Sequence, residues 1–233
     1  MIVLSFDTSL AASSAAVVEV GGQARVLAAS YEEPGRGHAE ILLAMIKDVM
    51  TGAGVGFEDI DRQIVTMGPG SFTGVRVALS AARGFRVAHN IPICSLTTMQ
   101  AVAANISRIE TLEPQSLSAV IIDARRHQAY GQVFDATLKP LCAPSLIEAD
   151  SLEPWLEPWK DMPLVLMGTG AGLVRTKDCA LPGNWTAIHE YSLPDAACFA
   201  AVLKHIRPDE APSDPLYLRQ PDAKPQIIGQ KNA

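Results

Sequence analysis

Residues 2–9 read IVLSFDTS, and residues 120–125 read VIIDAR. Each stretch is an apolar run that ends in an aspartate, Asp7 in the first and Asp123 in the second. In both places a short polar turn leads into a second apolar stretch, AAVVEV in the first and AYGQVF in the second. Because a strand, a turn and a further strand recur in this way, the sequence indicates one supersecondary unit used twice. It therefore predicts an α/β protein of two related lobes.

Helical periodicity predicts one helix over residues 38–51, which is stopped by a glycine-rich stretch, and a second over residues 73–89. A last helix is expected over residues 194–206. Five prolines between Pro208 and Pro225 favour an extended chain end. We therefore divide the chain into a first lobe at residues 1–97, a second lobe at residues 98–207 and an extended Pro-rich segment at residues 208–233.

The composition narrows the class of protein. Charged residues make up 19% of the chain, below the roughly 25% of average soluble domains, which suggests that part of the surface is covered by something else. No apolar run approaches the roughly 18 residues of a membrane span. The start, MIVLSFD, lacks the basic region of a signal peptide. Four cysteines without a C-x-x-C pair indicate free thiols in a reducing cytosol. We expect a cytoplasmic protein without membrane contact.

The net charge of −6 argues against nucleic-acid binding by the isolated chain, because phosphate neutralisation requires a basic face. Local exceptions exist at Arg125 and Arg126. Trp155 and Trp159, four residues apart, could stack on RNA bases. The ordinary interpretation of such a pair is that it caps a core, and we favour that interpretation.

Two turns carry residues that suit phosphate binding. Asp7, Thr8 and Ser9 follow a strand, so the aspartate could orient metal-bound water while the hydroxyls donate to phosphate. The alternative is an Asx-type turn. The second turn, GPGSFTGVR, contains Gly70 and Ser71 and begins a helix whose free amides could bind an anion. It lacks the Lys-Ser/Thr ending of a P-loop, which excludes ATP hydrolysis by that route.

The helix over residues 38–51 is unusually apolar. At about 100° per residue its apolar side chains span an arc of roughly 200°, about twice what packing on one sheet requires. The second helix carries small residues and a polar stripe that includes Arg76 and Arg83. Two interpretations stay open: both helices are sandwiched inside one domain, or they form a docking surface for another protein.

Metal and nucleophile chemistry find little support. His38 would need a second ligand four residues on, and that position is Leu42. No Ser-His-Asp order and no pair of carboxylates stands out. We expect no metal and no catalytic residue.

Several segments together resemble the TsaB (YeaZ) family: IVLSFDTS, GRGHAEILLAMI, GPGSFTGVRVALSAARG, VIIDARRHQAYGQVFD and PLYLR, in order over nearly the whole chain. The resemblance implies an actin-like fold (ASKHA, ribonuclease H-like). It also implies a part in threonylcarbamoylation of the adenosine beside the anticodon in tRNAs that read ANN codons. In that system TsaD performs the transfer with a metal held by a His-x-x-x-His motif, whereas TsaB is a non-catalytic scaffold, and the ATPase TsaE joins the pair.

The resemblance turns the open interpretations into expectations. A heterodimer with TsaD is expected, or a homodimer in its absence, through the interface residues Ile41, Leu42, Met45, Val49, Arg76, Leu79 and Arg83. Asp7, Thr8, Ser9, Gly70, Ser71 and Asp123 would then be a vestigial phosphate site. No cofactor is required by the isolated chain, ATP or ADP being expected only at the complex interface, and tRNA is met only through the complex. The alternative is a stand-alone actin-like ATP-binding phosphotransferase.

Overall fold

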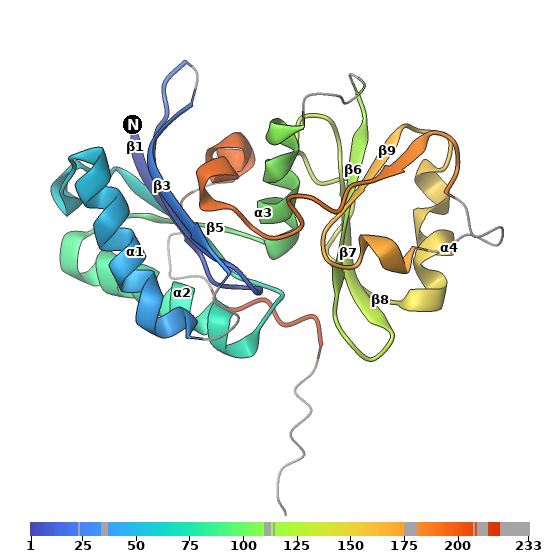
Figure 1. The fold of residues 1–233 in the computed structure, drawn as a ribbon, viewed down its shortest axis with the longest axis horizontal. Helices are drawn as coiled ribbons and strands as arrows, with labels where there is room; N and C mark the ends of the chain where they lie inside the picture. Colours follow the sequence, from blue (N-terminus) through green and yellow to red (C-terminus); the bar gives the residue numbers. More distant parts are fainter. Residues whose placement is uncertain are drawn as a thin grey trace, which may run out of the picture.

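The computed structural model describes residues 1–22, 24–33, 37–109, 113, 115–174, 181–206, 208 and 214–219, without the side chains of His38 and Ala39. In these residues the strands form two separate five-stranded sheets, one in each half of the chain (Figure 1). Most of the predicted Pro-rich segment at residues 208–233 lies outside the described residues, as does Cys179.

The first sheet begins with an antiparallel meander and continues with parallel strands. Its order is β3-β2-β1-β4-β5, where β1 pairs antiparallel with β2 and β2 with β3, while β1, β4 and β5 run parallel. The strands are β1 (Ile2–Asp7), β2 (Ser13–Glu19), β3 (Arg25–Glu32), β4 (Arg62–Thr66) and β5 (Ile93–Leu96).

The second sheet repeats this arrangement. Its order is β10-β9-β6-β7-β8, with β6, β7 and β8 antiparallel and β6, β9 and β10 parallel. The strands are β6 (Leu117–Asp123), β7 (Gln128–Phe134), β8 (Ser145–Glu148), β9 (Leu164–Met167) and β10 (Trp185–Ala187). Because each sheet begins on its central strand and adds two antiparallel and then two parallel neighbours, the prediction of a duplicated ribonuclease H-like, actin-like fold is confirmed.

Helices cover the outer faces of the sheets and fill the space between them. On the first sheet lie α1 (His38–Ala53) and α2 (Phe72–His89), and beside the second sheet lies α4 (Leu152–Leu156) (Figure 1). Between the sheets lie α3 (Thr98–Ala104) and the 3-10 helix η6 (Ala196–His205). Short 3-10 turns complete the fold: η1 (Phe57–Asp59), η2 (Asn105–Arg108), η3 (Ala149–Ser151), η4 (Glu157–Trp159) and η5 (Ala171–Leu173).

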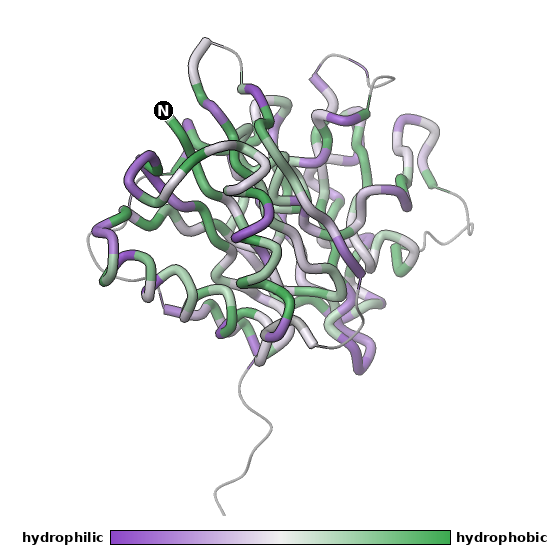
Figure 2. Tube along the Cα trace, turned by 60° about the vertical axis from the view of Figure 1, so that its left-hand side comes forward, coloured by the Kyte–Doolittle hydropathy of each residue, from purple (hydrophilic) through white to green (hydrophobic). Residues whose placement is uncertain are grey.

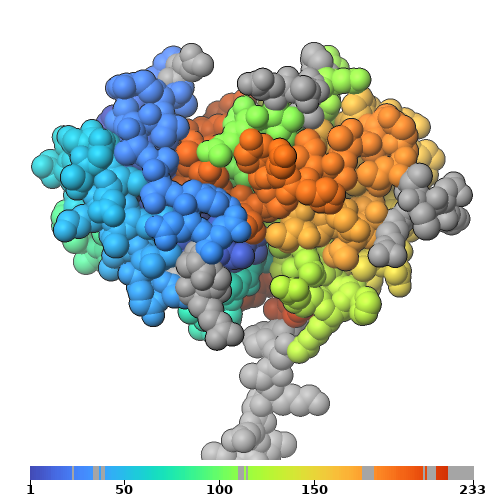
Figure 3. All heavy atoms as spheres, viewed as in Figure 1, coloured from blue at the N-terminus to red at the C-terminus, as the bar shows by residue number. Residues whose placement is uncertain are grey.

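The last helix, η6, packs across the sequence-based lobe boundary. Although we assigned residues 98–207 to the second lobe, η6 contacts β1 and β2 of the first sheet as well as α3. In Figure 3 the orange stretch that includes this helix meets the blue N-terminal part of the chain. The reason is apolar burial: Phe199 and Val202 are fully buried in the same cluster as Val3 and Val18. The helix η6 therefore covers the strands β1 and β2 from the beginning of the chain.

The largest apolar cluster is shared by both sheets. It joins Val3 and Ile64 of the first sheet to Val120 and Met167 of the second through Met99 of α3. Figure 2 shows hydrophobic stretches gathered in the interior and hydrophilic ones in outlying loops. Two further clusters lie on the outer sides, under α1 and α2 in the first half and under α4 in the second. Within the described part of the chain, no helix is both long and apolar enough to cross a membrane.

Candidate functional site

The predicted partner interface on α1 is largely inside the protein. Leu42, Met45 and Val49 are between 1% and 3% exposed, and Leu79 of α2 is 2% exposed. All four belong to the apolar cluster beneath the two helices. Met45, Val49 and Leu79 therefore leave almost no surface for a partner to contact. Their place in a partner interface, and that of Leu42, which also lines the groove described below, stays a prediction.

The reason is that α1 is covered from two directions by its own chain. It packs against β2 and β3 on one side and against α2 on another. An arc of roughly 200° is what such a double contact requires, since each neighbour covers about half of it. The interpretation that the helices are sandwiched within one domain therefore holds for the buried part of the apolar arc of α1.

The outer rims of α1 and α2 nevertheless leave an apolar groove open. Its volume is about 630 Å³, and its lining includes Leu42, Leu43, Phe72, Arg76, Val77 and Ala81. The side chains of Leu43 and Phe72 are 57% and 55% exposed. Phe72, one residue after the N-cap Ser71, was not among the predicted interface residues.

The remaining predicted interface residues lie close to this groove. Ile41 is partly buried on α1 and packs against the cluster below. Arg76 is exposed and lines the groove, with its guanidinium carbon 3.6 Å from the centre of the Phe72 ring. Arg83, about two turns further along the same face of α2, forms an ion pair with Asp214 at 3.2 Å. The groove thus combines apolar, aromatic and guanidinium chemistry.

Asp7, Thr8 and Ser9 form a closed turn. All three are fully buried. The Asp7 carboxylate accepts hydrogen bonds from the Ser9 amide at 3.1 Å and from the Thr66 hydroxyl, and the Thr8 hydroxyl donates to the Gly74 carbonyl at 2.7 Å. The bond from Asp7 to the amide two residues on is that of an Asx turn.

The start of α2 is packed directly onto this turn. The Ser71 amide donates to the Ser9 carbonyl at 2.7 Å, and the Gly74 amide donates to the Ser71 hydroxyl at 3.2 Å. A Cβ atom at Gly70 would lie 2.2 Å from the Ser9 carbonyl oxygen. The glycines therefore permit close approach of the protein's own backbone, and these two amides of the helix N-terminus already have acceptors.

Asp123 occupies the equivalent position in the second sheet. Its carboxylate accepts a bond from the Arg125 amide at 2.7 Å, again two residues on, and lies 3.5 Å from the Arg125 guanidinium. Arg125, Arg126 and His127 all have left-handed backbone angles, with φ of 63°, 55° and 58°. Asp123 lines a cavity of about 380 Å³ that is also lined by Gly70, Ser71 and Arg125. The structure thus brings Gly70, Ser71 and Asp123 together and leaves Asp7, Thr8 and Ser9 outside the cavity.

The predicted phosphate site does not fit a bound nucleotide phosphate. In the first turn the hydroxyl of Thr8 and the amides of Ser71 and Gly74 are bonded within the protein. In the second turn the Arg125 guanidinium lies 3.5 Å from the Asp123 carboxylate, where it crowds the approach of a phosphate. We therefore derive no reaction step through ATP or ADP.

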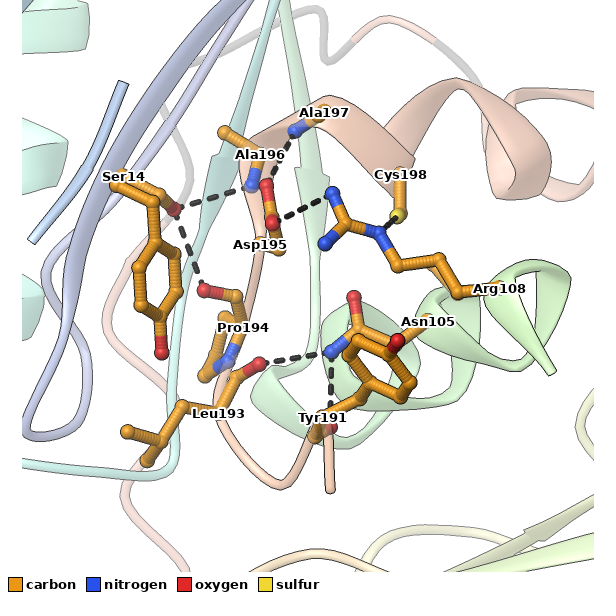
Figure 4. A network of polar contacts seen from close by, with 12 residues as sticks. Ser14, Asn105, Arg108, Tyr191, Leu193, Pro194, Asp195, Ala196, Ala197 and Cys198 are labelled. Carbon is orange, nitrogen blue, oxygen red and sulfur yellow. Dashed lines mark hydrogen bonds and ion pairs between the residues drawn. The ribbon is translucent and has the colours of Figure 1, made fainter. Parts of the chain in front are cut away.

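A larger cavity of about 660 Å³ opens beside the cavity that Asp123 lines. Its lining includes Tyr31, Asn105, Arg108 and Tyr191. Figure 4 shows how its wall is held. Asn105 donates from Nδ2 to the carbonyls of Tyr191 and Leu193 at 2.9 and 2.7 Å. Ser14 accepts from the Ala196 amide at 3.0 Å and donates to the Pro194 carbonyl at 3.2 Å. The loop before η6 is therefore fastened from both sides.

Arg108 and Cys198 close the upper part of this network (Figure 4). Arg108 pairs with Asp195 at 2.7 Å, and its Nε atom donates to the Cys198 sulfur at 3.1 Å. Burial raises the pKa of the Cys198 thiol, although Arg108 opposes the shift. A thiol with a raised pKa is poorly ionised at neutral pH and is therefore a poor nucleophile. Cys94, Cys142 and Cys198 are all free thiols.

The tryptophan pair is part of the apolar packing of the second half. Trp155 and Trp159 pack edge to face with ring centres 5.9 Å apart and lie against the apolar cluster of the second half, as we favoured. The side chain of His38, weighed and rejected as a metal ligand, lies outside the described residues.

Taken together, the duplicated sheet and the site geometry define a member of the actin-like fold class that carries an apolar surface groove on a helix pair. The family model of TsaD, tRNA N6-adenosine threonylcarbamoyltransferase, matches residues 29–205. The chain is 28% identical to the tRNA threonylcarbamoyladenosine biosynthesis protein TsaB of Escherichia coli, over 99% of this chain and 100% of that protein.

One solved structure and one further relative agree with these similarities. The structure of YeaZ from Pseudomonas aeruginosa superposes with a TM-score of 0.76 at 25% identity and covers 93% of this chain and 99% of that one. A Streptococcus pneumoniae tRNA N6-adenosine threonylcarbamoyltransferase is also similar, with 28% identity over 55% of this chain and 42% of that enzyme. The chain belongs to the TsaB (YeaZ) family, within the wider family of TsaD-like proteins.

Proposed function

We propose that this chain acts in tRNA threonylcarbamoyladenosine biosynthesis as a non-catalytic subunit that pairs with TsaD. The observation that carries the proposal is the apolar groove between α1 and α2, with Leu43 and Phe72 more than half exposed on its rims. Exposed apolar side chains gathered along a groove are typical of protein interfaces.

The similarity to TsaD suggests how the two proteins meet. The matched residues, 29–205, include both helices that form the groove. A TsaD chain therefore offers a related helix pair, and two related pairs can pack about an approximate twofold axis with each groove receiving the rim of the other. The same argument predicts that the groove pairs with a second copy of this chain when TsaD is absent.

The closed turns support a non-catalytic role. The Thr8 hydroxyl and the amides of Ser71 and Gly74, which an actin-like enzyme could direct at phosphate, are bonded within this protein. In this proposal the chain holds TsaD in a competent arrangement, TsaE joins the pair, ATP or ADP is bound at the complex interface, and tRNAs that read ANN codons are met only through the complex.

Leu43→Asp tests the proposal. A carboxylate placed on the groove rim would have to be buried in the complex without a partner, which should weaken TsaD binding at least about 30-fold, the scale of an interface hot spot. The measurement is titration calorimetry with purified TsaD, supported by co-elution on size exclusion. The position is 57% exposed, so the isolated variant should fold normally.

Met162→Asp is the matched control, because Met162 is a 43% exposed apolar residue in the other half of the chain. It should bind TsaD like the wild type. Full affinity in Leu43→Asp would contradict the proposal. So would turnover of ATP by the isolated wild-type chain, which would revive the alternative of a stand-alone phosphotransferase.

A further inference from the structure

A segment from the far end of the chain, residues 214–219 (the strap), lies on the first half of the molecule. The Leu216 amide donates to the Met67 carbonyl at 2.7 Å, just after β4. Asp214 pairs with Arg83 of α2 at 3.2 Å. The strap thus runs along α2, one of the two helices that form the groove.

Tyr217 of the strap forms a three-part stack with two groove residues. Its ring lies nearly parallel to that of Phe72, with centres 5.8 Å apart and planes at 27°. The Arg76 guanidinium carbon lies 3.6 Å from the centre of the Phe72 ring and 5.8 Å from that of Tyr217, and Arg76 Nε donates to the Tyr217 hydroxyl at 2.9 Å. Tyr217 remains 45% exposed.

This stack is continuous with the groove. Phe72 and Arg76 line it, so Tyr217 extends its rim beyond the helix pair. Tyrosine and arginine are enriched among the residues that dominate binding energy at interfaces, because they combine apolar area with directed polar groups.

The strap is held in place at both ends before any partner binds. Beyond Tyr217, the Arg219 guanidinium donates to the Arg125 carbonyl at 3.2 Å and to the Gln128 side chain, both in the second half of the molecule. A surface that is ordered in advance loses less conformational entropy on binding and therefore binds more tightly.

We propose that the partner-docking surface is composite and that the strap contributes Tyr217 to it, as an anchor formed with Phe72 and Arg76. This inference rests on the proposed function, since the occupant is the same TsaD chain. The partner would contact the exposed edge of the stack while its helices occupy the groove.

Tyr217→Ala, in the full chain, should weaken TsaD binding at least tenfold in titration calorimetry, whereas Tyr217→Phe, which keeps the stack and loses only the hydroxyl, should stay within about threefold of the wild type. Tyr191→Ala is the matched control. Tyr191 is 40% exposed and also lies beside an arginine, since its ring centre is 5.7 Å from the Arg108 guanidinium carbon. It lines the larger cavity instead of the groove. Wild-type affinity in Tyr217→Ala would overturn the inference.

Hydrogen exchange gives a measurement that does not depend on a variant. Amides of the strap should exchange more slowly when TsaD is added to the wild-type chain, and unchanged exchange there would also overturn the inference. Leu43→Asp in the same titrations separates the two proposals. Loss of binding in Leu43→Asp with none in Tyr217→Ala contradicts the strap alone, whereas full binding in both contradicts the docking surface as a whole.

Discussion

The burial of the Asp7 carboxyl group has a clear consequence for the free energy of unfolding. It is fully buried, and its Oδ2 atom has no hydrogen-bond partner among the described residues. Burial raises its pKa from 3.8 to about 6, against the opposing effect of hydrogen bonds from Thr66 and Ser9. Because the folded state then holds the proton more tightly than the unfolded chain does, stability falls as the pH rises from about 4 to about 6.

Asp7→Asn should remove this pH dependence. The asparagine oxygen can still accept the bonds from Thr66 and Ser9, and no charge is then buried at neutral pH. We expect the free energy of unfolding of the variant, relative to wild type, to rise by about 1–3 kcal/mol between pH 4 and pH 7. Urea titrations at both pH values measure it. A difference between the two proteins that stays constant over this range would contradict the assignment.

At the scale of single residues, the sequence could predict the turn at Asp7 but not its environment. An aspartate after a strand followed by hydroxyl residues supports both an Asx turn and a phosphate site, since both use the same side chains. What decides between them is the start of α2, which packs onto the turn from more than sixty residues away. That approach depends on tertiary packing, which a local pattern does not contain.

The helix α2 contains two glycines in contrasting surroundings. A Cβ atom at Gly74 would lie 1.9 Å from the Thr8 carbonyl oxygen, whereas one at Gly84 would meet nothing within 4 Å. The first glycine is required by close packing of the helix against the turn. The second only costs backbone entropy in a helix interior.

Substituting alanine at each position should therefore have opposite effects. Gly74→Ala should lower the free energy of unfolding by about 2–4 kcal/mol, because backbone must move to relieve the overlap. Gly84→Ala should raise it by about 0.5–1 kcal/mol through helix propensity. Thermal and urea unfolding of both variants check this pair, and destabilisation by Gly84→Ala would show that its space is not open.

At the scale of elements, the bounds of α1 and α2 followed from local signals. Gly54, with φ of 69°, ends α1, and Ser71 caps α2 through the Gly74 amide. The apolar arc of α1 was also correctly read as too broad for one neighbour. The identity of the second neighbour could not be predicted, because a helical wheel gives the width of an apolar face and not which element covers it. Here α2 of the same chain packs against α1 beside the sheet, and Leu42, Met45 and Val49 are buried in the apolar cluster beneath the two helices.

For the whole molecule, the loop before η6 is held by Asn105 on one side and by Ser14 of β2 on the other. This side chain is 1% exposed and donates to two backbone carbonyls of the loop. On the surface, Asn184 donates in the same way to the carbonyls of Lys160 and Met162, each at 2.9 Å. The two asparagines therefore make matching contacts at very different burial.

Asn105→Asp should be far more damaging than Asn184→Asp. The first places a carboxylate oxygen against two carbonyls in the interior and should cost about 3–5 kcal/mol. The second does so in water and should cost no more than about 1 kcal/mol. Urea midpoints of the two variants give the comparison, and equal losses would show that Asn105 does not fasten the loop.

The repeated sheet was the part of the whole molecule that the sequence predicted best, because Asp7 and Asp123 mark equivalent strand ends. The placing of η6 and the strap was missed, since both return to the first half from the end of the chain. Hydrophobic periodicity reports the local structure of a segment and does not show which distant segment it contacts.

The central cluster around Phe199 has a consequence for biosynthesis. A nascent chain that has emerged only as far as β5 would present β1 and β2 with one face bare, because the helix that covers it is translated more than a hundred residues later. Such an intermediate would expose apolar side chains until η6 is made. The two halves should consequently melt together, and neither can be expressed alone as a faithful copy of its part in the intact protein.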